Sequence, residues 1–215
     1  MKKGGTIVIT ISRQEASGGS YIGHLVARRL DFKYFDRDIL YEASKYLEVN
    51  ESEISSLEEK PSSFFEKLLR AFSFEIPEVA YMPPSRPIYD RDLFDIESKI
   101  INEIAERYNA VIIGRGGFYV LRGHPGLVNV FVHAPLNFRI KRIMEVRNIS
   151  DRDKALSEIE ESDRNREKFI RDMTGVNWTD ARNYHLCIDT SAVSFTIAEE
   201  MIVKLVESIR YNLGL

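Results

Sequence analysis

The stretch TIVITISRQEASGGS, residues 6–20, changes character at its midpoint. Its first half is β-branched and apolar, a composition typical of a buried strand. Its second half is rich in small residues, and apolar residues at helical spacing follow it at Ile22, Leu25, Val26 and Leu30. The stretch therefore predicts a strand, a tight turn and a helix in direct succession.

The turn SGGS at residues 17–20 has the features of a phosphate-binding loop. Small residues let backbone N–H groups converge on an anion, and the start of the following helix carries partial positive charge. A glycine pair between a strand and a helix also occurs as a plain tight connection, so the turn alone leaves both interpretations open. Under the first interpretation, nucleotide phosphates are bound by Ser17, Gly18, Gly19, Ser20 and Tyr21.

The turn departs from the Walker pattern GxxxxGK[ST] at two positions. Gly18 and Ser20 fit the second glycine and the hydroxyl residue of that pattern. Gly19 then stands in place of the lysine, and Arg13 stands in place of the first glycine. Ser20 can still ligate a magnesium ion, but positive charge for a transferring phosphate has to come from other residues.

We expect arginines to supply this charge. Arg13 lies in the loop itself, where a surface ion pair with Glu15 is the alternative interpretation. Arg139, Arg142 and Arg147 share a later predicted helix, at separations where only the first pair clearly lies on one face. The charged residues 148–183 add further arginines, although a charge run is usually a solvated surface. The predicted catalytic residues are Arg13, Arg139, Arg142 and Arg166.

Composition places the chain among soluble single-domain proteins. Its 215 residues match one domain, since domains usually take roughly 100–200 residues. The net charge of -3 provides no overall basic field for a nucleic-acid backbone, so we expect a small ligand. The one cysteine, Cys187, cannot form an intrachain disulfide, and no apolar run reaches the roughly 18 residues of a membrane helix. We therefore expect a cytoplasmic protein without a nucleic-acid or membrane partner.

Apolar runs recur along the chain and alternate with helical stretches. They occupy residues 33–35, 110–113, 127–132 and 185–188. Together with the first strand they predict an α/β fold, a three-layer sandwich with a five-stranded parallel sheet covered on both faces. Cys187 lies in the last run, so we expect it to be a core residue rather than a nucleophile.

Two longer stretches interrupt this alternation. Residues 45–100 include the break MPPSRP at residues 82–87, and residues 148–183 are dense in charge. A helix is predicted over residues 95–108, where isoleucines at helical spacing mark a buried stripe. Neither stretch has the character of an independent domain, so residues 1–215 are predicted to form one domain.

Five separated stretches stand in one order: ITISRQEASGG, YFDRDIL, VIIGRGG, TGVNW and NYHLCIDTS. In these stretches the chain resembles the cytidylate kinase-like family of P-loop nucleoside monophosphate kinases, whose members commonly carry a lysine-free SRxxxSGG loop. The resemblance implies an adenylate-kinase-like fold with a monophosphate-binding insert at residues 45–100 and a mobile lid at residues 148–183. It also implies ATP as the phosphoryl donor and Mg2+ as the cofactor, with Ser20 as a metal ligand.

The resemblance also suggests residues that hold the acceptor. Residues 36–38 follow a predicted strand end, where ligands gather at the carboxyl edge of a parallel sheet, although a helix cap with a solvated ion pair is the alternative. Arg115 matches the arginine of the cytidylate kinase GRD motif, in which Gly116 replaces the aspartate. The run DRNR at residues 163–166 matches a nucleotide-contacting run, with intrahelical pairing as the alternative. The predicted acceptor-binding residues are Asp36, Arg37, Asp38, Arg115, Asp163 and Arg164.

The activity that the resemblance implies is transfer of the ATP γ-phosphate to a nucleoside monophosphate, with CMP or dCMP as the favoured acceptor. Two alternatives stay open. The chain could be a nucleotide-binding regulator with little catalysis, because its loop lacks the lysine, or a kinase for another small acceptor. Its partners are then small-molecule nucleotides, and we expect a monomer or a homodimer.

Overall fold

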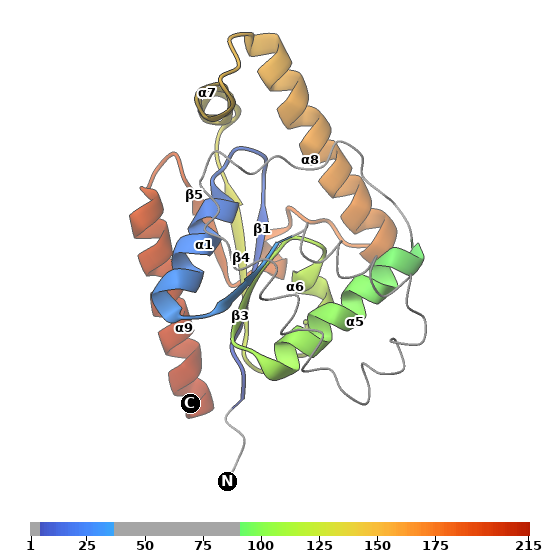
Figure 1. Ribbon diagram of the computed structural model, residues 1–215, viewed down its shortest axis with the longest axis vertical. Coiled ribbons are helices and arrows are strands. Elements are labelled where there is room, and N and C mark those ends of the chain that lie inside the picture. The colour runs from blue at the N-terminus through green and yellow to red at the C-terminus, as the bar shows by residue number, and fades with distance from the viewer. Residues whose placement is uncertain (1–4, 37–90) are drawn as a thin grey trace.

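Five parallel strands form the centre of the computed structural model, which describes residues 5–36 and 91–215 (Figure 1). The strand order in the sheet is β2-β3-β1-β4-β5. The strands are β1 Val8–Arg13, β2 Lys33–Phe35, β3 Ala110–Ile113, β4 Leu127–His133 and β5 Leu186–Asp189. The predicted parallel sheet is therefore confirmed, and its strands lie within two residues of the predicted limits.

Strand register brings the ends of the central strands to one edge of the sheet. Ile11 of β1 pairs with Ile113 at the end of β3, and Arg13 pairs with Val132 near the end of β4. The chain leaves β1 toward β2 on one side, whereas β4 and β5 lie on the other side. Ligands of open α/β sheets bind where the strand order reverses in this way, at the carboxyl ends of the strands.

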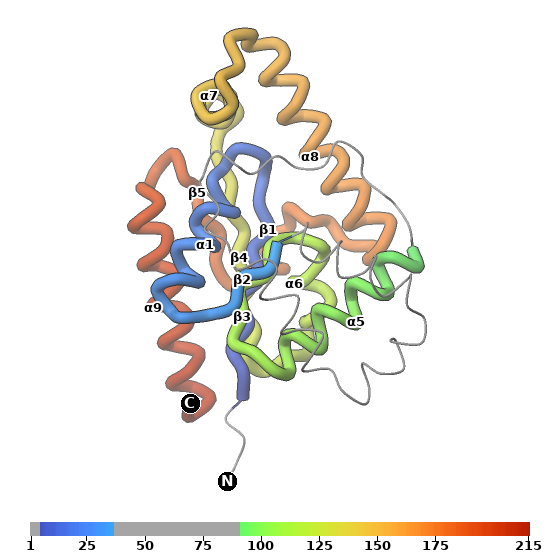
Figure 2. Tube along the Cα trace, in the orientation of Figure 1, coloured from blue at the N-terminus to red at the C-terminus, as the bar shows by residue number. Residues whose placement is uncertain are grey.

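Helices cover both faces of the sheet. α1 and α9 lie on one face, and α5 and α6 lie on the other, while α7 and α8 meet at the end of the molecule farthest from the C-terminus (Figures 1 and 2). The helices are α1 Gly19–Leu30, α5 Arg91–Arg107, α6 Gly117–Val120, α7 Leu136–Arg147, α8 Arg152–Thr174 and α9 Phe195–Leu213. The segment after α8 contains a short 3-10 turn, Ala181–Asn183.

Apolar side chains fill both interfaces between helices and sheet. Ile22 and Val26 of α1 are fully buried against the sheet, and Ile100 and Ile104 of α5 are equally buried on the other face. Gly23 lets α1 approach closely, because a Cβ there would lie 2.6 Å from Ile113 Cδ1. This close packing holds the start of α1 at the carboxyl end of β1.

α7 and α8 pack on each other through a small separate core. Ile140 and Ile143 of α7 contact Ala155 and Ile159 of α8, and all four are buried. The far end of α8 buries Phe169 in an aromatic cluster with neighbours from the sheet and from the segment after α8. Most of the predicted lid segment is therefore one helix, packed at both of its ends.

Two features differ from the sequence predictions or lie beyond them. Cys187 is exposed, so its prediction as a core residue is wrong, because β5 lies at the edge of the sheet formed by the described strands, with β4 as its neighbour. Arg37, Asp38 and residues 45–90 of the predicted insert lie outside the described residues. Within the described ranges, no helix is long and apolar enough to cross a membrane.

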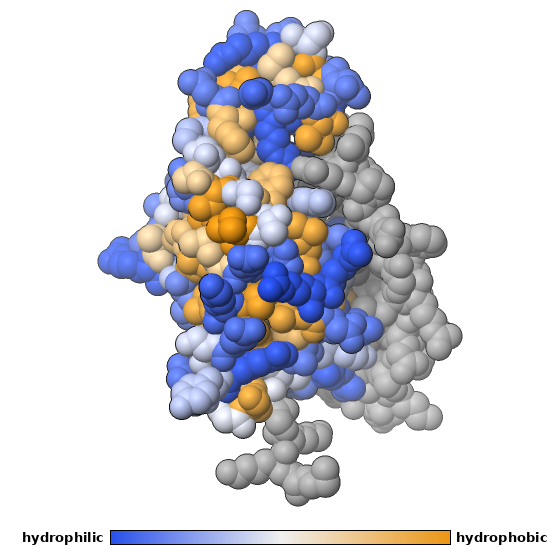
Figure 3. All heavy atoms as spheres, turned by 90° about the vertical axis from the view of Figure 1, so that its left-hand side faces the viewer, coloured by the Kyte–Doolittle hydropathy of each residue, from blue (hydrophilic) through white to orange (hydrophobic). Residues whose placement is uncertain are grey.

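The surface on the side of α1 and α9 contains both hydrophilic and apolar residues. Hydrophilic residues predominate there, with apolar residues interspersed (Figure 3). Ile197 and Met201, one turn apart on α9, are 44% and 41% exposed. Single apolar residues of this kind are normal on a protein surface.

Candidate phosphate-binding site

A cavity lies where the carboxyl end of β1 meets α7 and α8. Its wall is formed by the loop after β1, the first turns of α1, the end of β2 and the facing sides of α7 and α8. Among the residues that line it are four arginines, Arg13, Arg142, Arg147 and Arg166. Segments far apart in the sequence thus place several positive charges beside one glycine loop.

The loop has a compact backbone that two left-handed residues shape. Ala16 has φ 60° and Gly18 has φ 84°. Ser17 is fully buried, and its Oγ lies 2.8 Å from Gln14 O and 3.1 Å from Val132 O. The Ser17 side chain therefore fastens the loop to β4, so only its backbone is available for the predicted phosphate contact.

The start of α1 suits an anion. Gly18 is the N-cap and provides no side-chain hydrogen bond to the first N–H groups, and the first turn contains no acidic residue. Gly18, Gly19, Ser20 and Tyr21 all line the cavity. Unsatisfied N–H groups and the helix dipole together favour a phosphate at such a position.

Arg13 occupies the space that a lysine at position 19 would need. A Cβ on Gly19 would lie 2.6 Å from Arg13 Cβ, and a Cβ on Gly114 would lie 2.4 Å from Arg13 Nη1. The Arg13 side chain therefore runs from the loop to the end of β3, and its Nε donates to Ser20 Oγ at 3.2 Å. Arg13 is only 7% exposed, which contradicts the alternative of a surface ion pair.

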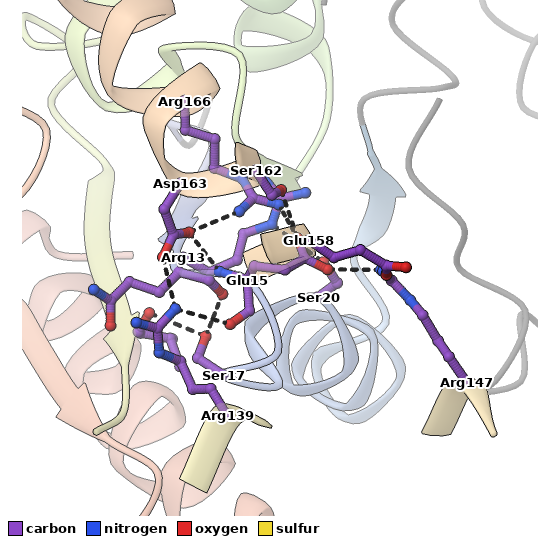
Figure 4. Close-up of polar contacts among 12 residues, drawn as sticks. Arg13, Glu15, Ser17, Ser20, Arg139, Arg147, Glu158, Ser162, Asp163 and Arg166 are labelled. Atoms are coloured by element: carbon purple, nitrogen blue, oxygen red, sulfur yellow. Dashed lines mark hydrogen bonds and ion pairs between the residues drawn. The ribbon is translucent and has the colours of Figure 1, made fainter. Parts of the chain in front are cut away.

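Glu15 is a buried carboxylate within the loop. Its Oε1 accepts a hydrogen bond from Arg147 Nη2 at 2.7 Å, and its Oε2 accepts from Arg166 Nη2 and from Ser162 Oγ (Figure 4). Burial acts to raise the pKa of Glu15, but Arg166, Arg147 and the Ser162 hydrogen bond outweigh it and lower the pKa to about 2. Glu15 is therefore ionised at neutral pH and joins the loop to both helices.

Asp163 makes a second connection between the same elements. Its Oδ1 accepts from the Glu15 backbone N–H at 2.8 Å and from Arg166 Nη1 at 3.1 Å (Figure 4). Its Oδ2 accepts from Arg139 Nη1 at 2.6 Å. Arg139 also donates through Nε to Ala134 O at 2.9 Å. These bonds fix α8 against the loop and the start of α7.

The structure brings together many of the predicted residues but not all of them. The predicted residues that line the cavity are Arg13, Gly18, Gly19, Ser20, Tyr21, Asp36, Arg142 and Arg166. Arg139 and Asp163 lie beside it as an ion pair, with Arg139 buried and Asp163 partly buried, rather than in its wall. The sequence placed Arg139 and Arg142 on one face of their helix. In the structure only Arg142 of the two lines the cavity, since Arg139 turns toward Ala134 and Asp163.

Arg115 lies outside the cavity wall, in a different environment. It forms an ion pair with Glu97 of α5, through Nε at 2.6 Å and through Nη2, and Glu97 is fully buried. Its guanidinium lies 4.1 Å from the centre of the Phe169 ring. Gly114, Arg115 and Gly116 all have positive φ, which is unusual for arginine and turns its side chain inward.

Arg164 points away from the cavity as well. Its side chain is 67% exposed and pairs with Glu160 on the outer side of α8. Arg164 therefore pairs within its helix and away from the loop. Arg166, two positions later, forms the intrahelical pair with Asp163 that the alternative interpretation predicted, and it also reaches Glu15 of the loop. The two arginines of the DRNR run thus serve different surfaces of one helix.

Several residues of the site were not among those predicted, and three of them bear on its charge and shape. Glu15 and Arg147 line the cavity, and Phe195 at the start of α9 covers Gly18, where a Cβ would lie 2.6 Å from Phe195 Cζ. Arg142 lies over the Phe195 ring at 4.9 Å. An acidic residue in a loop that otherwise suits anions is a local inconsistency in the sequence, and it could have marked Glu15 as paired.

The oxygen donors of the cavity suit a magnesium ion held mainly by nucleotide phosphates. Ser20 and the nearly buried Asp36 line the cavity. Within the described part of the chain, no group of three acidic, histidine or cysteine side chains is arranged to hold a metal by itself. Mg2+ commonly takes one or two protein ligands and fills its shell with water and substrate phosphates.

This combination of a glycine loop after β1, a parallel sheet of order 2-3-1-4-5 and arginines at the loop defines the class of P-loop kinase folds. A sequence model of the cytidylate kinase-like family matches residues 8–192, and the chain belongs to that family. No curated protein matches the chain in sequence.

Solved structures show the same fold. An uncharacterized protein from Eubacterium ventriosum is similar with 21% identity and a TM-score of 0.70, covering 94% of this chain and 99% of that chain. A gluconokinase from Sinorhizobium meliloti is similar with 15% identity and a TM-score of 0.50, covering 99% of both chains. A shikimate kinase from Acinetobacter baumannii has 14% identity and a TM-score of 0.47, covering 94% of both chains. At these identities the first two show the shared fold and nothing further.

Proposed function

We propose that this chain is an ATP- and Mg2+-dependent phosphotransferase whose acceptor is a nucleoside monophosphate, with CMP or dCMP first. The observation that carries the proposal is the meeting of the glycine loop with arginines of the loop, α7 and α8 around one cavity. In the reaction, an oxygen of the acceptor phosphate bonds to the γ-phosphorus while the bond to the bridging oxygen of ADP breaks. Positioning and charge neutralisation supply the catalysis, so no covalent intermediate is needed.

Each part of the cavity wall has a role in this proposal. The N–H groups at the start of α1 hold the donor phosphates, and Ser20 with Asp36 provides oxygen ligands for Mg2+, which neutralises donor oxygens when bound. Arg13, Arg142 and Arg166 neutralise the transferring group in place of the absent lysine. Arg147, which the sequence did not single out, belongs to the same group because it lines the same wall.

The acceptor side of the proposal rests on the family. The segment at residues 45–100 would contact the monophosphate, and residues 148–183 would act as the lid. Arg37 and Asp38 belong to this acceptor side as a prediction, whereas Asp36, which the sequence grouped with them, is assigned here to the metal. Arg139 and Asp163 are assigned to holding α8 in place, and Arg164 is given no role at the cavity because of its surface pair.

ADP release in the presence of ATP and Mg2+ tests the proposal across all nucleoside monophosphates. We expect release to depend on both Mg2+ and the acceptor, and to be fastest with CMP or dCMP. Arg166→Ala should lower kcat by about 10³-fold, by analogy with other arginines that act on a transferring phosphate. Arg171→Ala is the matched control, because Arg171 lies on the same helix, 62% exposed, and pairs with Glu167.

A second candidate activity has one observation in its favour. Arg115, the arginine that the family would use for an acceptor phosphate, is engaged with buried Glu97. An acceptor with a hydroxyl group and no phosphate would leave this pair intact, whereas a monophosphate would have to compete with it. A panel that adds polyhydroxy compounds to the monophosphates separates the two activities. ATP binding without turnover on either panel would instead support a nucleotide-binding regulator.

A further inference from the structure

Glu15 is a buried carboxylate that the proposed transfer does not use. It lies in the loop that is expected to hold phosphates, and it is 6% exposed. An unpaired carboxylate there would repel a phosphate group and would be poorly solvated. Its presence in the loop therefore calls for a role that does not require contact with the nucleotide.

The contacts of Glu15 connect three segments of the chain. Arg147 is the last residue of α7, and Arg166 and Ser162 lie on α8. All three side chains reach the Glu15 carboxylate, while the Glu15 N–H is bound by Asp163 of α8. Figure 4 shows Arg166 and Arg147 approaching the loop from different sides. Glu15 therefore joins the loop to both helices by polar bonds, and Ala16 beside it packs against their apolar core.

The charge of Glu15 offsets a repulsion between these helices. Arg147 and Arg166 are 18% and 19% exposed, so their guanidinium groups are only partly solvated. Two like charges beside one cavity repel each other, and each arginine has one further carboxylate partner, Glu158 for Arg147 and Asp163 for Arg166. A carboxylate between them removes the repulsion and fixes the direction of both groups.

We propose that Glu15 is a positioning residue, which fixes the guanidinium groups of Arg147 and Arg166 at the phosphate loop before nucleotide binds. The inference rests on the proposed function for its effect on catalysis. Arg147 donates one bond to Glu158 through Nη1 and one to Glu15 through Nη2. Each of these nitrogens carries a second N–H, so Arg147 can contact a phosphate while it stays paired. The guanidinium groups of Arg147 and Arg166, which Glu15 holds at the loop, thus supply positive charge in place of the missing lysine.

Amide hydrogen exchange of the nucleotide-free full chain tests the positioning directly. In Glu15→Gln, we expect amides of residues 152–163 to exchange about tenfold faster than in the parent, because Ser162 and Arg166 of α8 lose a charged partner in the loop while the Asp163 bond to the backbone N–H of residue 15 remains. Glu158→Gln is the matched control. It makes the same charge change beside Arg147, but Glu158 contacts Arg147 without touching the loop, so the exchange of these amides should change much less. Equal exchange in Glu15→Gln and the parent would overturn the inference.

Steady-state kinetics test whether the positioning serves catalysis. We expect Glu15→Gln to lower kcat by about 10–100-fold while the KM for ATP changes by less than about threefold, since an effect on the transition state appears in kcat. Glu15→Asp keeps the charge and should recover part of kcat, and it is the variant to use if Glu15→Gln does not fold. Faster exchange with an unchanged kcat would show a purely structural role and also overturn the inference.

The two proposals fail in different ways. A parent protein without acceptor-dependent ADP release would contradict the proposed function, whereas the exchange experiment needs no turnover. In that case, faster exchange in Glu15→Gln still supports the attachment of α8, and its proposed use in phosphoryl transfer is rejected. If the parent shows acceptor-dependent turnover and Glu15→Gln exchanges no faster than the parent, the proposed function stands. Only the positioning role of Glu15 is then rejected.

Discussion

At the scale of single residues, the side chain of Arg13 explains why position 19 is a glycine. A side chain at position 19 would collide with the Arg13 stem at Cβ, which lies 2.6 Å from the required position. The absent lysine is thus part of an arrangement in which Arg13 fills the space between the loop and the end of β3. The sequence shows both departures from the Walker pattern, but only the packing shows that they are coupled.

Restoring the lysine should therefore damage the protein. We expect Gly19→Lys to lower the free energy of unfolding by about 1–3 kcal/mol, as overpacking of a filled site does, without raising kcat. The double variant Arg13→Gly with Gly19→Lys removes the collision with Arg13 and leaves the 3.1 Å contact with Val132 Cβ, so the effect of the lysine on stability should be smaller in that background. Urea unfolding of the four proteins of this cycle measures the coupling. If the effects of the two substitutions on the free energy of unfolding simply add, the proposed collision between Arg13 and a side chain at position 19 is contradicted.

Because Glu15 is ionised in the folded protein, the free energy of unfolding should decrease at acidic pH. Its pKa in the folded protein is about 2, below the ordinary value of 4.5, so the stabilisation is complete above pH 4.5 and is lost as pH falls through 2. The loss attributable to Glu15 is about 3 kcal/mol. Urea unfolding between pH 6 and pH 2 measures it, with Glu15→Gln as the control. If the variant shows the same slope as the parent, other carboxylates account for the acid sensitivity.

At the scale of secondary-structure elements, prediction succeeded for strands and stopped at the orientation of side chains. Runs such as AVII at residues 110–113 are β-branched and apolar, so their burial in a parallel sheet follows from composition. The exposure of Cys187 depends on β5 lying at an edge, which no local pattern reveals. Arg139 and Arg147 show the same limit, because their roles depend on where α8 packs.

The bonds by which Asp163 attaches α8 should contribute substantially to the free energy of unfolding. In Asp163→Asn, Arg139 and Arg166 lose a charged partner, and we expect the free energy of unfolding to fall by about 2–4 kcal/mol, since Arg139 is nearly buried. Glu160→Gln on the same helix is the control, because its pair with Arg164 is exposed and its loss should change stability by less than about 0.5 kcal/mol. Thermal unfolding of both variants provides the comparison. Similar effects of the two substitutions would show that the Asp163 bonds do not hold α8.

At the scale of the whole molecule, apolar runs were sufficient to predict the sheet, and the order of motifs along the chain was sufficient to predict the family and the position of the glycine loop. Membership of the family is shown over residues 8–192. The site is only partly predictable, because four arginines from the loop and two helices meet there through tertiary packing. Sequence spacing predicts which residues share an element, and it does not predict which elements share a cavity.

Binding of ATP should stabilise the whole domain if the cavity holds its phosphates. At a free ATP concentration 100-fold above Kd, with Mg2+ present, the expected gain is about 2.7 kcal/mol. For a protein of this length, that gain corresponds to a rise in Tm of roughly 5–10 °C. Adenosine at the same concentration is the control, because it lacks phosphates and should produce a much smaller rise. Equal shifts with both compounds would place the binding energy outside the phosphate loop.

The short outer strands of the sheet have a consequence for how copies of this protein associate. Among the described residues, β2 contributes three residues and β5 four, at the two ends of the strand order. Unpaired N–H and C=O groups on a long edge invite another chain to add a strand, and that route underlies aggregation as well as sheet-to-sheet dimers. Edges this short provide little template for such growth. A homodimer of this protein is therefore expected to form through helical surfaces, and concentrated solutions should resist the assembly of continuous sheets.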